Sequence, residues 1–171
     1  MMHHGFDRVR SMMIFASLLF ISNMALADND YYNESVPPQP NAFYDVNLTN
    51  PVTMRDFMGV IDLTYDLMID KGVPPAKIKF VVSLRGLSVA FATREFGMGT
   101  PDEQVGIQIR EILNSLLDKG VRIEACIISC IWVGVDPDDL LDGVLVIDNA
   151  FASSIWYQTK GYALIPIHQL P

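Results

Sequence analysis

The chain has few of the groups on which metal sites and nucleic-acid surfaces depend. Its 171 residues include three histidines, and its 12 basic residues are outnumbered by 20 acidic ones, so the net charge is −8. An acidic surface repels phosphate backbones, and we therefore expect no nucleic-acid partner. Two of the histidines are His3 and His4, and His168 stands alone at the other end. A histidine-rich metal site is excluded, and we expect neither a metal ion nor a cofactor.

The chain also lacks an apolar run of the length that spans a bilayer near its N-terminus. Arg8 and Arg10 precede an apolar stretch at 12–21, about half of the ~20 residues that a membrane span needs. Ala25-Leu26-Ala27 supplies the small residues of a cleavage site. Residues 1–27 are therefore predicted to be a secretory signal peptide, the alternative being an amphipathic or disordered N-terminus. After cleavage the protein would be periplasmic or secreted, without a membrane association.

The segment after the predicted cleavage site changes composition near residue 42. Residues 28–41 hold three prolines among polar residues and show no hydrophobic period, which predicts a flexible leader. Half of the chain is hydrophobic, enough for residues 42–171 to form one domain with its own core. This domain contains no internal repeat and no Gly-x-Ser-x-Gly elbow, so a serine hydrolase is not supported.

The domain alternates strand-like and helix-like patterns. Strands are expected at 43–48, 78–84, 144–147 and 162–165, and 121–133 is expected to be a buried strand that feeds a short helix. Helices are expected from a cap at Thr53, from a capping box at Thr100 and over 149–160. This order predicts an α/β fold with three α/β/α layers and a mainly parallel five-stranded sheet. The first strand is expected at a sheet edge, 78–84 at its centre, and 144–147 in a buried position.

Cys126 falls where the third predicted strand meets the following helix. The carboxyl end of a parallel strand opens into the crevice where ligands bind, and a helix N-terminus lowers the pKa of a thiol. Cys126 is therefore a candidate nucleophile, although a small buried core residue is the alternative. Cys130 is a candidate resolving thiol, core residue or disulfide partner, and a disulfide would require Cys126 to precede the helix proper. Arg85 would stabilise a thiolate, whereas Glu124 and Asp136 would oppose it.

Three further residues are predicted to share a crevice with Cys126. Arg85 and Gly86 follow the second strand, and Asn149 follows the fourth. Because the carboxyl ends of parallel strands meet at one edge of a sheet, these side chains are expected to line a common pocket. A metal site formed by Cys126, Cys130 and His168 is not supported, since neither the spacing nor a fourth ligand is present.

The domain resembles a known family in two motifs beside the cysteine strand. These are Leu-Asp-Gly-Val-Leu-Val-Ile at 141–147 and Gln-Thr-Lys-Gly-Tyr-Ala-Leu-Ile at 158–165. In them the chain resembles the DsrE/DsrF-like family of sulfur-relay proteins, and above all its exported members. The resemblance implies a three-layer α/β/α fold, a homo-oligomer that is a trimer or hexamer, and a persulfide on a cysteine after the third strand. Cys126 matches that cysteine, and Gly86 matches a family glycine.

The chain departs from the family pattern at two places. Arg85 stands where many relatives have histidine, and Ile128-Ser129 stand where exported relatives tend to have Asn-Thr. Two functions remain open at this stage. One is an exported sulfur carrier or thiol-redox protein that forms a persulfide or mixed disulfide on Cys126 and has a sulfur-donor or acceptor protein as partner. The other is a non-catalytic oligomeric binding module of the same fold. If the protein is an enzyme, its reaction would be sulfur transfer or thiol exchange.

The aromatic residues of the C-terminal half also favour a homo-oligomer. Trp132, Trp156 and Tyr157 together exceed the apolar surface that the core of one small domain is expected to cover.

Overall fold

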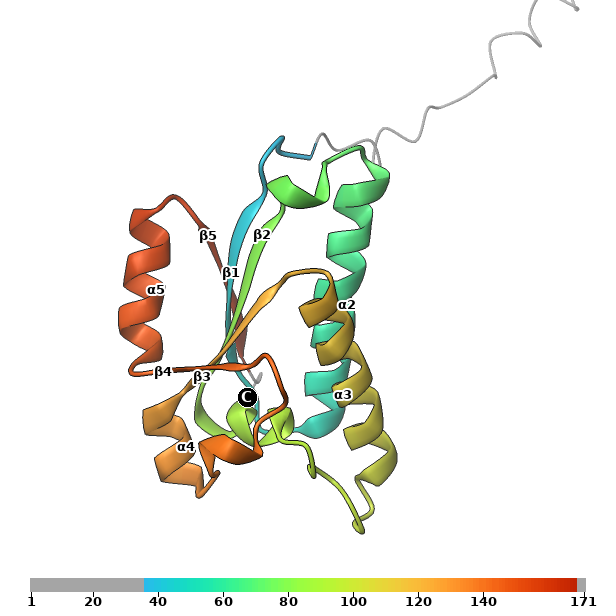
Figure 1. Ribbon diagram of the computed structural model, residues 1–171, viewed down its shortest axis with the longest axis vertical. Helices are drawn as coiled ribbons and strands as arrows, with labels where there is room; N and C mark the ends of the chain where they lie inside the picture. The colour runs from blue at the N-terminus through green and yellow to red at the C-terminus, as the bar shows by residue number, and fades with distance from the viewer. Residues whose placement is uncertain (1–35, 169–171) are drawn as a thin grey trace, which may run out of the picture. The chain divides into compact units, whose positions relative to one another are not determined.

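The computed structural model describes residues 36–168, which contain five strands, the helices that connect them and short 3-10 segments (Figure 1). The strands are β1 (Asn41–Asn47), β2 (Lys79–Leu84), β3 (Arg122–Cys126), β4 (Leu145–Ile147) and β5 (Ala163–His168). The helices are α2 (Pro51–Asp70), α3 (Glu103–Asp118), α4 (Ile127–Val133) and α5 (Ala150–Thr159), and the 3-10 segments are η2 (Pro75–Lys77), η3 (Gly86–Ala92) and η4 (Pro137–Asp139). The predicted signal peptide and most of the predicted leader lie outside the described residues.

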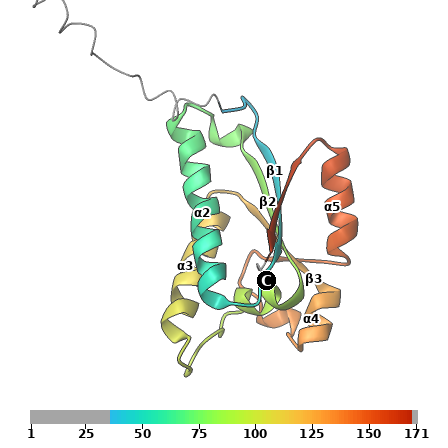
Figure 2. The same ribbon diagram turned by 180° about the vertical axis from the view of Figure 1, so that it is seen from behind.

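The five strands form one parallel sheet in the order β4-β3-β2-β1-β5. The chain moves outward one strand at a time from β1 to β4 and then returns across the sheet to β5. Because parallel crossovers are right-handed, this reversal places α5 on the face opposite to α2 and α3 (Figure 2). The predicted α/β fold, with a parallel five-stranded sheet and helices on both faces, is confirmed.

Strand positions agree with the sequence at the centre of the sheet and differ from it elsewhere. β2 is the central strand, as predicted for 78–84. β1 was expected at an edge, but it pairs with both β2 and β5, because it receives the returning last strand on its free side. β4 was expected to be buried, yet within the described residues it pairs with β3 alone and leaves Leu145 and Val146 exposed.

The helix starts depend on different capping residues from those predicted. α2 begins at Pro51, and Asn50 caps it by accepting the N–H of Thr53 on Oδ1 at 3.0 Å. Thr53, predicted as the cap, is therefore the residue whose amide is capped. At α3 the hydroxyl of Thr100 accepts the N–H of Asp102 at 3.1 Å, but the N-cap is Asp102 and the helix begins at Glu103, so the predicted capping box does not form. Within residues 36–168, none of the helices has both the length and the apolarity that a bilayer crossing requires.

The two faces of the sheet are covered unequally. The main core lies between the sheet and α2, α3 and η3 and includes these helix residues: Met54, Met58, Ile61, Tyr65, Ile109, Leu113 and Leu116. On the other face a small cluster contains Phe43, Val81 and Tyr157. Large apolar side chains stay exposed on the elements around this face, namely Ile131, Trp132, Leu145, Phe151, Ile155, Trp156 and Leu164.

Candidate functional site

A pocket of about 300 Å³ lies at the carboxyl end of the sheet. Its walls come from the ends of β1, β2 and β3 and from the starts of α4 and α5. The residues that line it are Asn47, Arg85, Gly86, Cys126, Ile128, Ser129, Trp132, Asn149, Ala150 and Phe151. The structure thus brings together four of the five residues nominated from the sequence, which are Arg85, Gly86, Cys126 and Asn149. Cys130 lies elsewhere.

Cys126 occupies the predicted junction between strand and helix. It is the last residue of β3 and the N-cap of α4. Side chains alternate along a strand, and Ile123 and Ala125 belong to the main core. Cys126 therefore faces the α5 side of the sheet together with Glu124. It is buried, with an exposed fraction of 5%, and it borders the pocket.

Polar groups around Cys126 favour its thiolate. Burial alone would raise the pKa of the thiol, but the amides of Ser129 and Ala150, the Ser129 hydroxyl and the Ile128 amide outweigh burial and lower the pKa below its ordinary value. The amides of Ile128 and Ser129 belong to the first turn of α4, and the amide of Ala150 begins α5. The starts of two helices thus converge on one sulfur atom.

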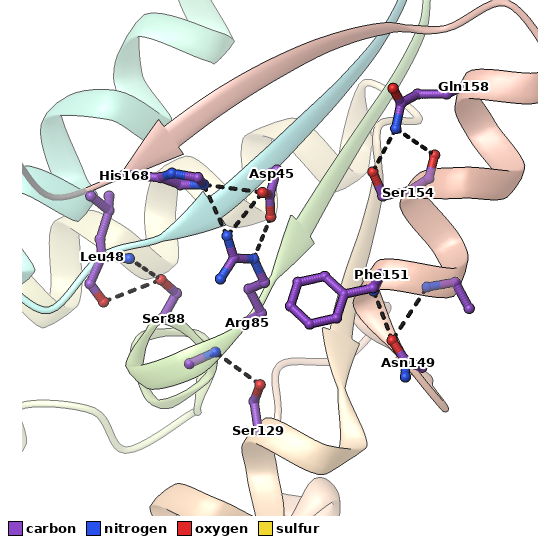
Figure 3. A network of polar contacts seen from close by, with 12 residues as sticks. Asp45, Leu48, Arg85, Ser88, Ser129, Asn149, Phe151, Ser154, Gln158 and His168 are labelled. Atoms are coloured by element: carbon purple, nitrogen blue, oxygen red, sulfur yellow. Dashed lines mark hydrogen bonds and ion pairs between the residues drawn. The ribbon is translucent and has the colours of Figure 1, made fainter.

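Ser129 is held in place by Gly86. The Ser129 hydroxyl accepts the N–H of Gly86 at 2.8 Å, which leaves its own proton free for the thiolate (Figure 3). Gly86 has a φ of 58°, and a Cβ atom at this position would lie 2.4 Å from Oδ1 of Asn47. Glycine is therefore needed here both for its backbone conformation and for space.

Asn149 lines the pocket as the N-cap of α5. Its Oδ1 accepts the N–H of Phe151 at 2.8 Å and the N–H of Ala152 at 3.2 Å (Figure 3). The cap fixes the first turn of α5, where the amide of Ala150 faces Cys126. Asn149 therefore acts on the thiol through the position of a helix start.

Cys130 lies one helical turn after Cys126 and is fully buried in the main core. Burial raises the pKa of the Cys130 thiol, and the charge of a Cys126 thiolate would raise it further. Both cysteines are free thiols. Of the three roles considered for Cys130, this position corresponds to the core residue.

Arg85 is bound by the carboxylate of Asp45, a residue of β1 that was not among the predicted site residues. Its Nε lies 2.7 Å from Oδ1 of Asp45 and its Nη2 lies 3.0 Å from Oδ2, so the contact is bidentate (Figure 3). The guanidinium also lies over the ring of Phe151, 5.4 Å from its centroid. The predicted partner of Arg85 was the thiolate of Cys126, but Asp45 already balances its charge.

His168 joins this ion pair from the last strand. Its Nε2 lies 3.0 Å from Oδ2 of Asp45 and 3.0 Å from Nη2 of Arg85. Burial alone would raise the pKa of Asp45, but the hydrogen bonds and charges of Arg85 and His168 lower it below its ordinary value. The sequence showed His168 as an isolated residue. The one sequence signal for Asp45 was a carboxylate between two apolar residues, Tyr44 and Val46.

The acidic residues that were expected to oppose the thiolate have partners of their own. Glu124 accepts hydrogen bonds from Arg122 at 2.6 Å, Ser153 at 2.6 Å and Tyr157 at 3.3 Å, which fastens α5 to β3. Burial, followed by the charge of Glu124, raises the pKa of Tyr157 to about 12. Asp136 accepts a backbone N–H at the start of η4. Among residues 36–168, no histidine, cysteine and acidic side chains gather in a group of three or more that would suit a metal ion.

Comparison with known proteins gives a likeness in fold. No family model and no curated protein matches the sequence. A protein of unknown function from Methanobacterium thermoautotrophicum, MTH1491, superposes with a TM-score of 0.56 at 20% identity, over 74% of this chain and 98% of that one. The ychN protein of E. coli superposes with a TM-score of 0.52 at 17% identity, over 75% and 99%. Both neighbours have DsrE/DsrF-like folds, and at these identities the likeness of this chain to them is one of fold alone.

Proposed function

We propose that the protein is an exported sulfur carrier or thiol-exchange protein whose nucleophile is Cys126. The proposal depends on one observation: Cys126 borders a pocket at the carboxyl end of the sheet, under amide groups that lower its pKa. A lowered pKa increases the fraction of thiolate near neutral pH, and the thiolate is the attacking species in sulfur exchange. The resemblance to the DsrE/DsrF-like family favours sulfur transfer among the possible thiol reactions.

In the proposed reaction the Cys126 thiolate attacks the outer sulfur of a persulfide, R–S–SH. A sulfur–sulfur bond forms to Sγ of Cys126 while the bond between the two donor sulfurs breaks, and its electron pair leaves with R–S⁻. Cys126 becomes a persulfide and no further oxidant is needed. Attack on a disulfide would give a mixed disulfide by the same exchange. Because Cys130 is buried in the core, we assign the discharge of Cys126 to a thiol of an acceptor protein.

The test uses full reduction, an organic persulfide as donor and intact mass as the measurement. The unmodified protein and Cys130→Ala should each gain one sulfur atom, and Cys126→Ser should gain none. If Cys126→Ser still gains sulfur, or if the reduced unmodified protein gains none, the carrier function is wrong.

A non-catalytic oligomeric binding module is the second candidate function. It is favoured by the small exposed fraction of Cys126 and by large aromatic side chains at the surface, with Trp156 exposed to 55%. Exposed apolar surface of this kind marks interaction sites. For either function we propose a homo-oligomer, a trimer or hexamer. Light scattering at micromolar concentration should show the assembly, and a monomer would contradict it.

Export is proposed from the sequence of residues 1–27. Mass spectrometry of the protein isolated from the producing cell should find Asp28 as the N-terminal residue, since the small residues of the cleavage site end at Ala27. A product that retains Met1 would contradict cleavage.

A further inference from the structure

The charge of the pocket limits the sulfur donors that it accepts. Among the described residues that line the pocket, Arg85 is the one with a positive charge. Asp45 binds that charge at 2.7 Å, and the side chains of Arg85 and Asp45 are exposed to only 19% and 20%, so solvent screens the pair weakly. His168 contacts both side chains from outside the pocket lining, and while His168 is neutral the Cys126 thiolate gives the pocket net negative charge, within a chain whose net charge is −8.

Part of the pocket wall is apolar and partly uncovered, and one of its aromatic rings, that of Phe151, lies against the guanidinium of Arg85. Ile128 and Ala150 contribute to its walls, together with two aromatic side chains of high exposure. Trp132 is exposed to 79% and Phe151 to 66%. Aromatic surface beside a reactive thiol offers contact area to an apolar group and gains free energy when that group covers it.

We infer that the pocket takes a sulfur donor whose carrier group R is organic, apolar and uncharged, and that Asp45 sets this selectivity by neutralising Arg85. An inorganic donor such as thiosulfate brings two negative charges to a site where the one cation is already paired. An apolar R group instead packs against Trp132 and Phe151 and leaves as R–S⁻ when Cys126 takes the outer sulfur. The identity of the donor depends on the proposed carrier function, whereas the charge selectivity concerns the thiol alone.

The charge selectivity is tested by alkylation, which involves no sulfur transfer. Iodoacetamide and iodoacetate differ by one negative charge, and Cys130→Ala leaves Cys126 as the single thiol. The rate ratio of iodoacetamide to iodoacetate at pH 8 should exceed that of a free small thiol. In this background Asp45→Asn frees the charge of Arg85, and the ratio should fall by roughly fivefold. Adding Arg85→Gln to Asp45→Asn removes the free cation, and the ratio should recover.

The matched control is Asp56→Asn. It removes the same charge from another arginine–aspartate pair, that of Arg55 and Asp56 on α2, which lies on the opposite face of the sheet. The ratio should not change in this variant. If Asp45→Asn and Asp56→Asn have the same ratio, or if Arg85→Gln does not restore it, the role of Asp45 is wrong. Circular dichroism of each variant confirms that it is folded before its ratio is used.

The class of donor is tested by comparing an aryl persulfide with thiosulfate, scored by sulfur added to Cys126. The aryl persulfide should react faster by at least about tenfold, and Trp132→Ala should narrow this difference by slowing the aryl persulfide more than thiosulfate. Equal rates for the two donors overturn the inference and leave the proposed function standing. If neither donor adds sulfur to Cys126 while the alkylation ratio stays high, both the proposed function and the inferred class of donor are wrong.

Discussion

The two faces of the sheet have different chemistry although they are built from the same strands. In β1, β2 and β3, the residues that alternate toward α2 and α3 are apolar and buried, among them Val46, Leu84 and Ile123. Their neighbours toward α5 include Asp45, Glu124 and Cys126, together with most of the hydrogen bonds and ion pairs of the candidate site. The comparison indicates that one face supplies most of the stability while the other holds the reactive group. Each of the following variants tests that division.

The largest effect is expected from a cavity in the α2 and α3 face. Leu113 of α3 is fully buried, and Leu113→Ala should lower the free energy of unfolding by about 2–5 kcal/mol. Denaturant unfolding measures the loss. The pKa of Cys126 should stay the same in this variant, because no contact to its pocket is changed. A large shift in that pKa would mean that the two faces are not independent.

Acid should weaken the α5 face through Asp45. Since the pKa of this carboxyl is lowered in the folded protein, the folded state binds fewer protons than the unfolded state, and stability falls as pH drops through the lowered pKa. The stabilisation is present above the ordinary carboxyl pKa and amounts to about 1.5–3 kcal/mol for a charged hydrogen-bonded group. Asp45→Asn should remove this part of the pH dependence, measured by unfolding between pH 2 and 7. If the stability of Asp45→Asn falls at low pH as much as that of the unmodified protein, the stabilising role of Asp45 is wrong.

A smaller effect is expected on the thiol when Ser129 loses its hydroxyl. Ser129→Ala removes one of the groups that lower the pKa of Cys126, so this pKa should rise and the alkylation rate at neutral pH should fall by up to about tenfold. The matched control is Ser88→Ala, which removes another buried hydroxyl bonded to the backbone, at Leu48. It should leave the thiol pKa as it is. If the Cys126 thiol has the same pKa in both variants, the Ser129 hydroxyl has a structural role and does not stabilise the thiolate.

The smallest effect compares two helix caps. Asn149→Ala and Asn50→Ala each remove an asparagine cap and should each cost about 1 kcal/mol of stability. Only the first loosens the helix start whose amide of Ala150 faces Cys126, so only Asn149→Ala should raise the thiol pKa. The pH profile of alkylation separates them, and the same pKa change in both variants would rule out a specific effect of the α5 cap.

Features that depend on residues close together in the chain were predictable from the sequence. Apolar periodicity gave the types of the elements, the central place of β2 and the boundary at which Cys126 ends a strand and caps a helix. The same assignment of strands also placed Arg85, Gly86 and Asn149 beside Cys126, because the carboxyl ends of parallel strands share one edge of the sheet. Each of these inferences requires only the period of a strand or helix and the rule for parallel sheets.

Contacts between distant segments were decided by the tertiary structure alone. The return of the chain to β5 put β1 inside the sheet and brought His168 to Asp45, 123 residues away in sequence. The same reversal carried α5 to the other face, where the amide of Ala150 meets the Cys126 thiol. No local pattern determines these contacts, because periodicity describes how a segment folds and not which segment it pairs with. The sequence by itself thus determined which thiol ends a strand at the site, while strand order and crossover direction decided the charge and hydrogen bonding around it.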